Sequence, residues 1–346
     1  MNINFGMWKK ALSGLVKMDD RQEWSNLDVV SKWLIATRSG VTIVTIYSCL
    51  IAGFLAYQDG IFSLLPWIIV TLGLFIAHGT NNLLNDYTDF SRGVDADDYF
   101  RIQYGVHPLV QKFWTKKQQL TWFVVSGAIA TLSGLYALAY TKFSPTILGL
   151  FTFGALILLL YTWPLKYYAL GELFIFLIWG PIMISSVYLV LNGGWTDKVW
   201  MVALAGVPFG LSVVSINLGK HIDKSPEDKR KHVGTLPVMI GEQPARYLDM
   251  FVLLMIYVVT IYLVFVPRFF TPIMLIVLFA GKRWLYAFAS LIKPRPSEPP
   301  KEWPAWPTWF SGFAFYHNRL FSNLFLLGML LNLIIRIAFP TFWVMH

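Results

Sequence analysis

Long apolar segments are the feature of this sequence that most restricts its fold. A helix needs roughly 20 consecutive apolar residues to cross a hydrocarbon core of about 30 Å, where water cannot satisfy backbone polar groups. Nine such segments lie near residues 33–57, 62–84, 119–141, 145–162, 170–192, 198–219, 247–266, 270–292 and 320–340. Charged residues make up only 14% of the chain, against about 25% in a typical soluble domain. The sequence therefore predicts an all-α, polytopic membrane protein with nine transmembrane helices around a central cavity.

The distribution of lysine and arginine predicts the orientation in the membrane. If the N-terminus is cytoplasmic, 24 of the 28 Lys and Arg residues fall on or near the cytoplasmic side. The four on the outer side are Lys142, Lys198, Arg268 and Arg336. Because cytoplasmic loops are enriched in Lys and Arg, we expect an integral protein of a bacterial or archaeal plasma membrane, with its polar loops cytoplasmic. The net charge of +9 then reflects this bias and contact with anionic membrane lipids, and it does not indicate nucleic acid as a partner.

The chain divides into three predicted parts. Residues 1–30 contain apolar pieces that are short and interrupted by acidic residues, which is typical of an amphipathic, cytoplasmic segment and not of a signal peptide. Residues 31–292 form the core, with eight helices and two polar loops, and residues 293–346 form a loop rich in Pro and Trp and the ninth helix. The polar loops follow the second and the sixth helix, which suggests two four-helix halves plus one helix.

The first polar loop reads "NNLLNDYTDFSRGVDADD", from Asn81 to Asp98. Asn85 and Asp89 are four residues apart, as are Asn82 and Asp86, so on a helix each pair lies on one face. Amide and carboxylate oxygens are hard ligands that suit Mg²⁺. Charges at a membrane boundary need an ion, a partner or water, and a metal site would supply the reason for this cluster.

The second polar loop has a similar composition. It contains Asn217 and His221, four residues apart, followed by Asp223 and Asp228. The basic residues near both loops are Arg92, Arg101, Lys220, Lys224, Lys229, Arg230 and Lys231. One such loop alone would more often be a solvated connection, but two at matching points favour a site. Alternating acids and bases suit a diphosphate that is held through metal ions and direct cation contacts.

Several motifs carry a family resemblance. "NDYTDFSRGVD" resembles the first aspartate-rich motif of the UbiA-type intramembrane prenyltransferases, in the form closest to the dihydroxynaphthoate prenyltransferases of menaquinone synthesis. "YTWPLKYYALGE", with Tyr161, Pro164 and the pair Gly171–Glu172, and "DKSPEDKRKHVGTLPVMIGE" resemble two later family segments. The likeness covers roughly residues 30–290.

The chain also departs from the family pattern. Gly93 occupies the position of a frequent third aspartate, for which Asp95 is a candidate replacement. Asp223 and Asp228 are five residues apart instead of four, and His107 stands where the family often has arginine.

The resemblance implies a Mg²⁺-dependent transfer of a prenyl group from a prenyl diphosphate to an aromatic, quinone-precursor type or lipid-like acceptor. The catalytic residues it implies are Asp89, Asp223, Lys220 and Arg101. The metal ligands it implies are Asn85, Asp86, Asp89, Asp95, Asp223 and Asp228. The substrate-binding residues it implies are Asn82, Arg38, Arg92, Tyr161, Lys166, Asn217 and His221. We expect Asn85 and Asp89 to lie opposite Asp223 or Asp228, and Arg38 to have a carboxylate or phosphate partner.

Two other functions remain open at this point. A polyprenyl-phosphate sugar-phosphate transferase belongs to the same superfamily and would use similar residues. A membrane transporter would also place carboxylates among helices, but generally near the bilayer midplane and on broken helices. Here the carboxylates gather at one face of the membrane, which favours the enzyme.

Overall fold

The computed structural model describes residues 3–95, 100–301, 303 and 305–343. Within these ranges all regular structure is helical, which confirms the predicted all-α class. Eight helical segments are long and apolar enough to cross a membrane. They are α4 (Ser39–Gln58), α5 (Leu64–Ser91), α6 (Lys116–Tyr140), α8 to α9 (Gly171–Asn192), α10 (Val199–Arg230), α12 (Glu242–Phe265), η4 to α13 (Pro272–Ser290) and α14 (Phe310–Ala338).

The predicted count of nine spanning helices is not confirmed. The segment expected at 145–162 forms α7 (Pro145–Leu160), an apolar helix of 16 residues that is shorter than the other eight spans in the described ranges. Pro145 begins this helix, where its fixed φ suits the first turn. Lys142 and Phe143 have positive φ values of 50° and 58°, so the chain reverses between α6 and α7.

Three helix boundaries differ from those predicted from the sequence, and each difference changes whether polar residues lie on a helix. The first span begins at Ser39, because Arg38 adopts a left-handed conformation with φ of 58° that separates α4 from α3 (Val29–Ala36). Helices α5 and α10 extend to Ser91 and Arg230, past the expected ends near 84 and 219. The aspartate-rich motifs are therefore not simply loops: Asp86, Asp89, Asp223 and Asp228 all lie on the last turns of α5 or α10.

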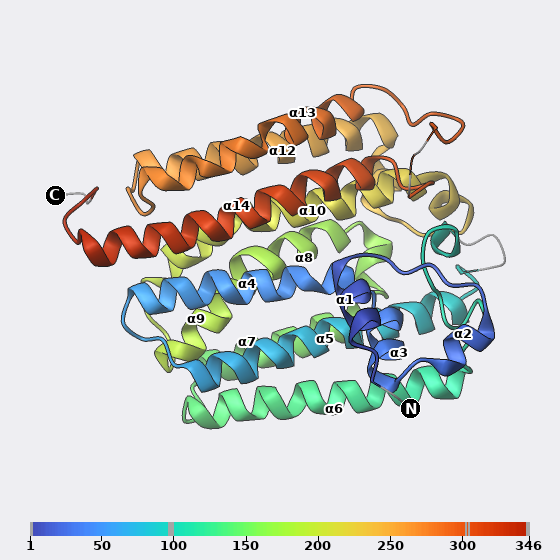
Figure 1. Cartoon of the computed structure of the whole chain (residues 1–346), viewed down its shortest axis with the longest axis horizontal. Helices are drawn as coiled ribbons and strands as arrows, with labels where there is room; N and C mark the ends of the chain where they lie inside the picture. The colour runs from blue at the N-terminus through green and yellow to red at the C-terminus, as the bar shows by residue number, and fades with distance from the viewer. Residues whose placement is uncertain (1–2, 96–99, 302, 304, 344–346) are drawn as a thin grey trace.

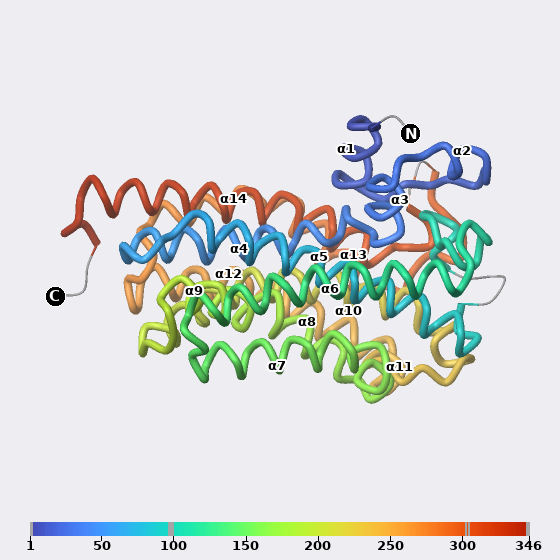
Figure 2. The backbone as a smooth tube through the Cα atoms, turned by 90° about the horizontal axis from the view of Figure 1, so that it is seen from below, coloured from blue at the N-terminus to red at the C-terminus, as the bar shows by residue number. Residues whose placement is uncertain are grey.

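The helices run roughly along the long axis of the molecule, as Figures 1 and 2 show. Helix α14 packs against α10, α4, η4 and α13, and α5 packs against α6, α4, α7 and α9. The N-terminal helices gather toward one end, and the C-terminal end of α14 lies at the other (Figure 1). The extended ends of α5 and α10 lie at the same end as the N-terminal helices (Figures 1 and 2).

A small apolar cluster supports the polar end of the bundle. Helices α1 (Phe5–Ser13) and α2 (Arg21–Asn26) contribute Ala11 and Trp24, which belong to one buried cluster with Phe113 and Trp114. Helix α1 packs against α3 and α4. The predicted boundaries at residues 30 and 292 stay predictions.

A kink fixes the position of α10. The segment Gly171–Asn192 is interrupted by a wide turn, η3 (Ile178–Ile182), in which Gly180 has φ −101° and ψ −105°. A Cβ on Gly180 would lie 2.8 Å from the Cα of Gly210 in α10, so the two backbones pack at a distance that only glycine allows. This contact holds α10 close to the segment that carries Glu172.

Candidate functional site

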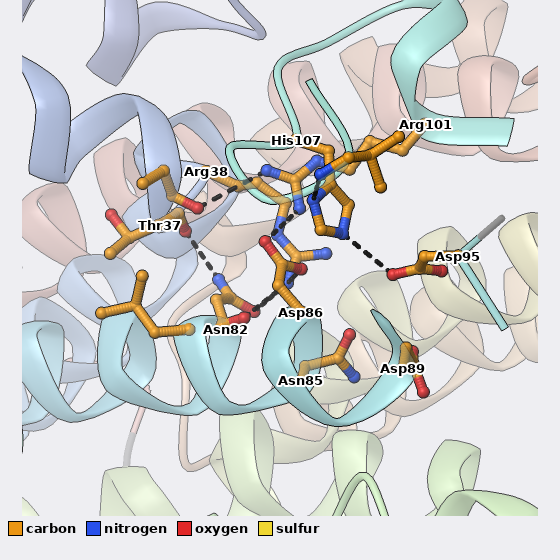
Figure 3. A network of polar contacts seen from close by, with 12 residues as sticks. Thr37, Arg38, Asn82, Asn85, Asp86, Asp89, Asp95, Arg101 and His107 are labelled. Carbon is orange, nitrogen blue, oxygen red and sulfur yellow. Dashed lines mark hydrogen bonds and ion pairs between the residues drawn. The ribbon is translucent and has the colours of Figure 1, made fainter. Parts of the chain in front are cut away.

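Asp86 lies at the centre of a buried polar network on α5 (Figure 3). Its carboxylate is 1% exposed and contacts two guanidinium groups, Arg101 at 2.5 Å and Arg38 at 3.3 Å. Arg38 also donates to Asn82 Oδ1 at 3.0 Å, and Asn82 Nδ2 donates to the carbonyl of Thr37 at 2.7 Å. The expected carboxylate partner of Arg38 is therefore present. Arg38 has a left-handed conformation and lies directly before α4, and from this position its side chain contacts Asp86.

The two neighbouring carboxylates each pair with one base. Asp89 Oδ2 lies 2.7 Å from Lys166 Nζ, and Asp95 Oδ2 lies 2.9 Å from His107 Nε2. All four side chains are buried. The amides of Val94 and Asp95 donate to the carbonyl of Asp89, at 2.9 and 3.4 Å, so the chain turns back directly at the end of α5.

Asn85 is held from the turn that follows α7. Its Nδ2 donates to Thr162 Oγ1 at 3.2 Å, which leaves its amide oxygen as an acceptor for a ligand. Arg92 is exposed, and its guanidinium lies over the rings of Trp163 and Tyr167, at 5.4 and 5.1 Å from the centroids. Arg92 thus borders the site on its aromatic side.

A second buried acid–base pair lies on the α10 side. Glu172 Oε1 is 2.6 Å from His221 Nδ1, and Asn217 Nδ2 is 3.4 Å from the same nitrogen. Tyr161 lies close by, since its hydroxyl and His221 Cε1 would both be within 4 Å of a Cβ on Gly171. Tyr161 also interacts electrostatically with Glu172, Arg38 and Asp89. Tyr161, Asn217 and His221 therefore lie close together, and their expected role in substrate binding stays a prediction.

Asp223 has partners that the sequence did not suggest. Its carboxylate accepts hydrogen bonds from the amides of Trp309, Phe310 and Ser311 at 2.9–3.0 Å and from the Ser311 hydroxyl at 2.9 Å. These groups form the N-terminus of α14, whose unpaired amides favour a negative charge. Asp223 therefore caps α14 in this structure. Both of its carboxylate oxygens accept hydrogen bonds from the start of that helix.

Asp228 is also occupied. Its Oδ1 lies 3.4 Å from Lys224 Nζ, one helical turn away, and its Oδ2 accepts from Thr235 Oγ1 at 3.4 Å. The expected metal-binding roles of Asp223 and Asp228 stay predictions, and both side chains would have to give up these contacts to bind an ion.

The two motifs lie close together despite their separation in sequence. Lys231, just after α10, donates to the carbonyl of Val94, just after α5. Lys220 lies within electrostatic range of Arg38, Lys166 and Arg101 on the other side of the site. The chain segments that follow α5 and α10 are therefore in contact. The expectation that Asn85 and Asp89 lie opposite Asp223 or Asp228 stays a prediction. Asp97 and Asp98, at the end of the first motif, lie outside the described residues.

The residues on α5 fit a magnesium ion. Among the described residues there is no group of three or more His, Cys, Asp or Glu side chains that could hold a metal unaided. However, Asp89 Oδ1 and Asp95 Oδ1 are buried and lack hydrogen-bond partners, whereas Asp86 Oδ1 lies 3.3 Å from Arg38 Nη2. Mg²⁺ takes one or two carboxylates and completes its shell with water and phosphate oxygens. Buried carboxylate oxygens that lack a hydrogen-bond partner are suitable ligands for such an ion.

Sequence reasoning did not assign a site role to Glu172, His107 or Thr162. Glu172 lies in a segment that resembles the family, and His107 lies where the chain departs from the family pattern. Both positions were therefore signals from which an ion-pair partner could have been predicted. Nothing in the local sequence indicated Thr162 as the partner of Asn85, because the two residues are 77 positions apart.

The fold and the two polar motifs define an intramembrane prenyltransferase type of architecture. The model of the UbiA prenyltransferase family matches residues 46–318, and the chain belongs to this family. A 1,4-dihydroxy-2-naphthoate octaprenyltransferase from Bacillus subtilis is 31% identical over 168 residues, which is 47% of this chain and 51% of that protein. The UbiA prenyltransferase domain-containing protein 1 of Danio rerio is 29% identical over 231 residues, covering 62% of this chain and 64% of the relative.

The chain thus spans about half to two thirds of the curated relatives that it matches. Solved structures share the fold. One, described in work on a digeranylgeranylglyceryl phosphate synthase, has a TM-score of 0.55 and 20% identity, over 88% of this chain and 98% of that chain. A UbiA homologue from Archaeoglobus fulgidus bound to DMAPP and Mg²⁺ has a TM-score of 0.52 and 15% identity, over 86% and 99%.

Proposed function

We propose that this protein transfers a prenyl group from a prenyl diphosphate to an aromatic, quinone-precursor type or lipid-like acceptor within the membrane, with the help of Mg²⁺. One observation carries the proposal: Asp89 near the end of α5 and Asp95 just after it each keep one buried oxygen without a hydrogen-bond partner, and Lys166 and Lys220 add positive charge nearby. A diphosphate and a divalent ion complement this mixture of charges.

The proposed donor site lies at the cytoplasmic end of the bundle. Lys166, Arg38, Arg101 and Lys220 would bind the diphosphate, and the ion pairs with Asp89 and Asp86 would hold three of these bases in place. Asn85, Asp89 and Asp95 would hold the metal, with Asp86 as a further candidate. When bound, Mg²⁺ neutralises negative charge on the diphosphate as it leaves.

Departure of the diphosphate leaves an allylic cation, which must be kept from water until the acceptor attacks. Aromatic faces stabilise a cation without reacting with it. We assign this role to Tyr161, and its position next to the Glu172–His221 pair supports the assignment. His78 is held by a 2.8 Å hydrogen bond to Thr45 and packs on Trp179 at 4.6 Å between centroids, which supports a structural role for it.

The class of acceptor rests on a separate observation. The likeness to a dihydroxynaphthoate prenyltransferase over about half of the chain supports a hydroxylated aromatic acceptor. The alternative within the same superfamily is transfer of a sugar phosphate to a polyprenyl carrier. A transporter is less well supported, because the ionisable groups lie at one end of the bundle and pair with one another.

The test is an assay of the full chain in lipid nanodiscs. Radiolabelled prenyl diphosphates of several lengths are incubated with Mg²⁺ and a panel of hydroxylated naphthoates, benzoates and polyprenyl or glyceryl acceptors, and lipid-soluble products are identified by mass. We expect a prenylated product that disappears with EDTA and returns with Mg²⁺. Asp89→Asn should lower the rate by at least about 100-fold, since a misplaced or missing ion removes electrostatic stabilisation of several kcal/mol. Full turnover in EDTA would contradict the metal-assisted mechanism.

A further inference from the structure

Large apolar side chains are exposed on the N-terminal helices, away from the site described above. Four of them, with exposed fractions of 40–69%, form what we call the N-terminal patch: Ile3, Phe5, Val29 and Val30. Asp28, which directly precedes two of the four, accepts hydrogen bonds from the Asn4 amide at 3.2 Å and from Trp8 Nε1 at 3.0 Å. Asn4 lies between the other two in sequence, so this contact brings both halves of the patch together. Exposed apolar patches mark surfaces that contact a protein or a membrane.

The N-terminal patch has a fixed position relative to the spanning helices. Helix α1 packs against α3 and α4, and Ala11 of α1 belongs to the buried cluster that includes Trp24 and Phe113. A Cβ on Gly40, in the first turn of α4, would lie 2.6 Å from the carbonyl oxygen of Gly14, so the chain after α1 is in backbone contact with the first span. The patch is therefore preformed on the folded chain.

The charges on the same segment have one sign. Residues 3–18 contain three exposed lysines and no acidic residue, and the lysines are Lys9, Lys10 and Lys17. The exposed acidic side chains of this region begin only at Asp19, before α2. Phe5 and Lys9 are four residues apart on α1, so an apolar and a basic side chain are neighbours on its surface. Exposed aromatic and basic side chains on one short helix are typical of helices that lie in a membrane interface.

The fold places this segment beside the bundle, at the level of a membrane surface. Only Thr37 and Arg38 separate α3 from α4, the first helix long enough to span. In Figure 2 α1, α2 and α3 project to one side of the bundle, at the end where α5 and α10 finish, and α1 runs across the direction of the spanning helices. A helix in this position adjoins the headgroups of one leaflet, because the spanning helices beside it cross the hydrocarbon core.

We propose that α1 is an interfacial helix that binds the surface of anionic phospholipids at this end of the bundle. The N-terminal patch enters the boundary between headgroups and acyl chains, and Lys9, Lys10 and Lys17 contact the headgroup phosphates. An anionic lipid surface complements both features at once, since it offers apolar contact and negative charge at the same depth. The inference concerns how the N-terminal segment contacts the membrane, and it is independent of the proposed reaction.

The experiment measures the depth of a fluorescent label on the N-terminal segment. In a Cys49→Ala background, the full chain carries Val30→Cys, within the patch, or Gln22→Cys, which is exposed on α2. Each cysteine is labelled with a small environment-sensitive fluorophore. The proteins are placed in nanodiscs of phosphatidylcholine alone or with one third phosphatidylglycerol, and quenching by lipids that are spin-labelled near the headgroup is recorded.

The variants separate the apolar contact from the charges. Phe5→Ser removes an apolar side chain of the patch, and Lys9→Glu combined with Lys10→Glu reverses the charge of α1. Lys116→Glu combined with Lys117→Glu is the matched control, because these are also adjacent, exposed lysines, at the start of α6. Thermal unfolding establishes that each variant is folded.

We expect the spin-labelled lipids to quench the label at Val30 at least about threefold more than the label at Gln22. Quenching at Val30 should be at least about twofold stronger with phosphatidylglycerol than without it, and Lys9→Glu with Lys10→Glu should abolish this difference. Phe5→Ser should reduce quenching in both lipid mixtures, and the control pair should change neither result. Equal quenching of the two labels would show that the patch does not contact the bilayer and would overturn the proposal. Strong quenching at Val30 that is the same in both lipid mixtures would overturn the binding of anionic headgroups.

Discussion

Replacement of Asp223 with alanine tests whether this carboxylate is a helix cap. The side chain is 1% exposed and accepts four hydrogen bonds from the first residues of α14. Loss of an N-cap costs about 0.5–2 kcal/mol, and each buried donor left unpaired costs about 1–3 kcal/mol, although water at this end of the bundle would recover part of this. We expect Asp223→Ala to lower the free energy of unfolding by about 3–5 kcal/mol.

The assay is thermal unfolding of the purified protein in detergent, combined with limited proteolysis. For a chain of this length the loss corresponds to a melting temperature lower by about 5 °C. The loop before α14 should also be cleaved faster, because Arg295 donates to the Asp223 carbonyl at 2.9 Å and to Pro307 at 3.0 Å, which ties that loop to the same turn of α10. Asp223→Asn keeps one acceptor oxygen and should lose about half as much stability.

The opposite pattern would refute the reasoning. If Asp223→Asn unfolds at the wild-type temperature but no longer retains Mn²⁺, the carboxylate is a metal ligand and the cap is incidental. If both variants unfold like the wild type and the loop is cleaved at an unchanged rate, the contacts with α14 contribute nothing measurable. A lower melting temperature with Mn²⁺ binding retained is the combination that the structure predicts.

Three further predictions concern other parts of the chain. Asp86→Ala should destabilise the protein by about 3–5 kcal/mol in the same unfolding assay, because it leaves the buried Arg101 and the partly buried Arg38 without their shared carboxylate; an unchanged melting temperature would contradict this. Burial alone would raise the pKa of Asp28, but hydrogen bonds from Ser31, Trp8 and Asn4 outweigh it and hold the pKa below its usual value. A depressed pKa stabilises the folded form above the unfolded pKa of about 3.9 and loses this effect as the pH falls through the folded value. Hydrogen exchange of residues 5–26, corrected for intrinsic rates, should therefore stay constant from pH 7 to about 4, rise in stronger acid, and lose that dependence in Asp28→Asn; loosening already at pH 6 would show that another group is responsible. Single cysteines at Lys112 and Asp197, in a Cys49→Ala background, should label from opposite sides of the membrane, and labelling from the same side would overturn the proposed orientation.

The sequence by itself determined the class of fold and the identity of the polar motifs. Apolar length is a local property, so each spanning segment could be located without knowledge of its neighbours, and Pro145 marked the start of α7 for a local reason as well. The spacing of Asn82, Asn85, Asp86 and Asp89 also predicted a shared helical region, because positions three and four apart are neighbours on any helix.

Only the tertiary structure decided which charges meet. Asp89 and Lys166 are 77 residues apart, and Asp223 is 86 residues from Trp309, so no spacing rule could pair them. The same applies to Glu172 and His221, which come together because the glycine contact at Gly180 holds α10 against the segment before it. In the sequence, the two motifs have similar compositions and suggest the same metal-binding role. In the folded chain one keeps free oxygens and the other uses its carboxylates on α14 and Lys224, because the partner of a buried charge is set by packing between distant helices and not by the residues beside it.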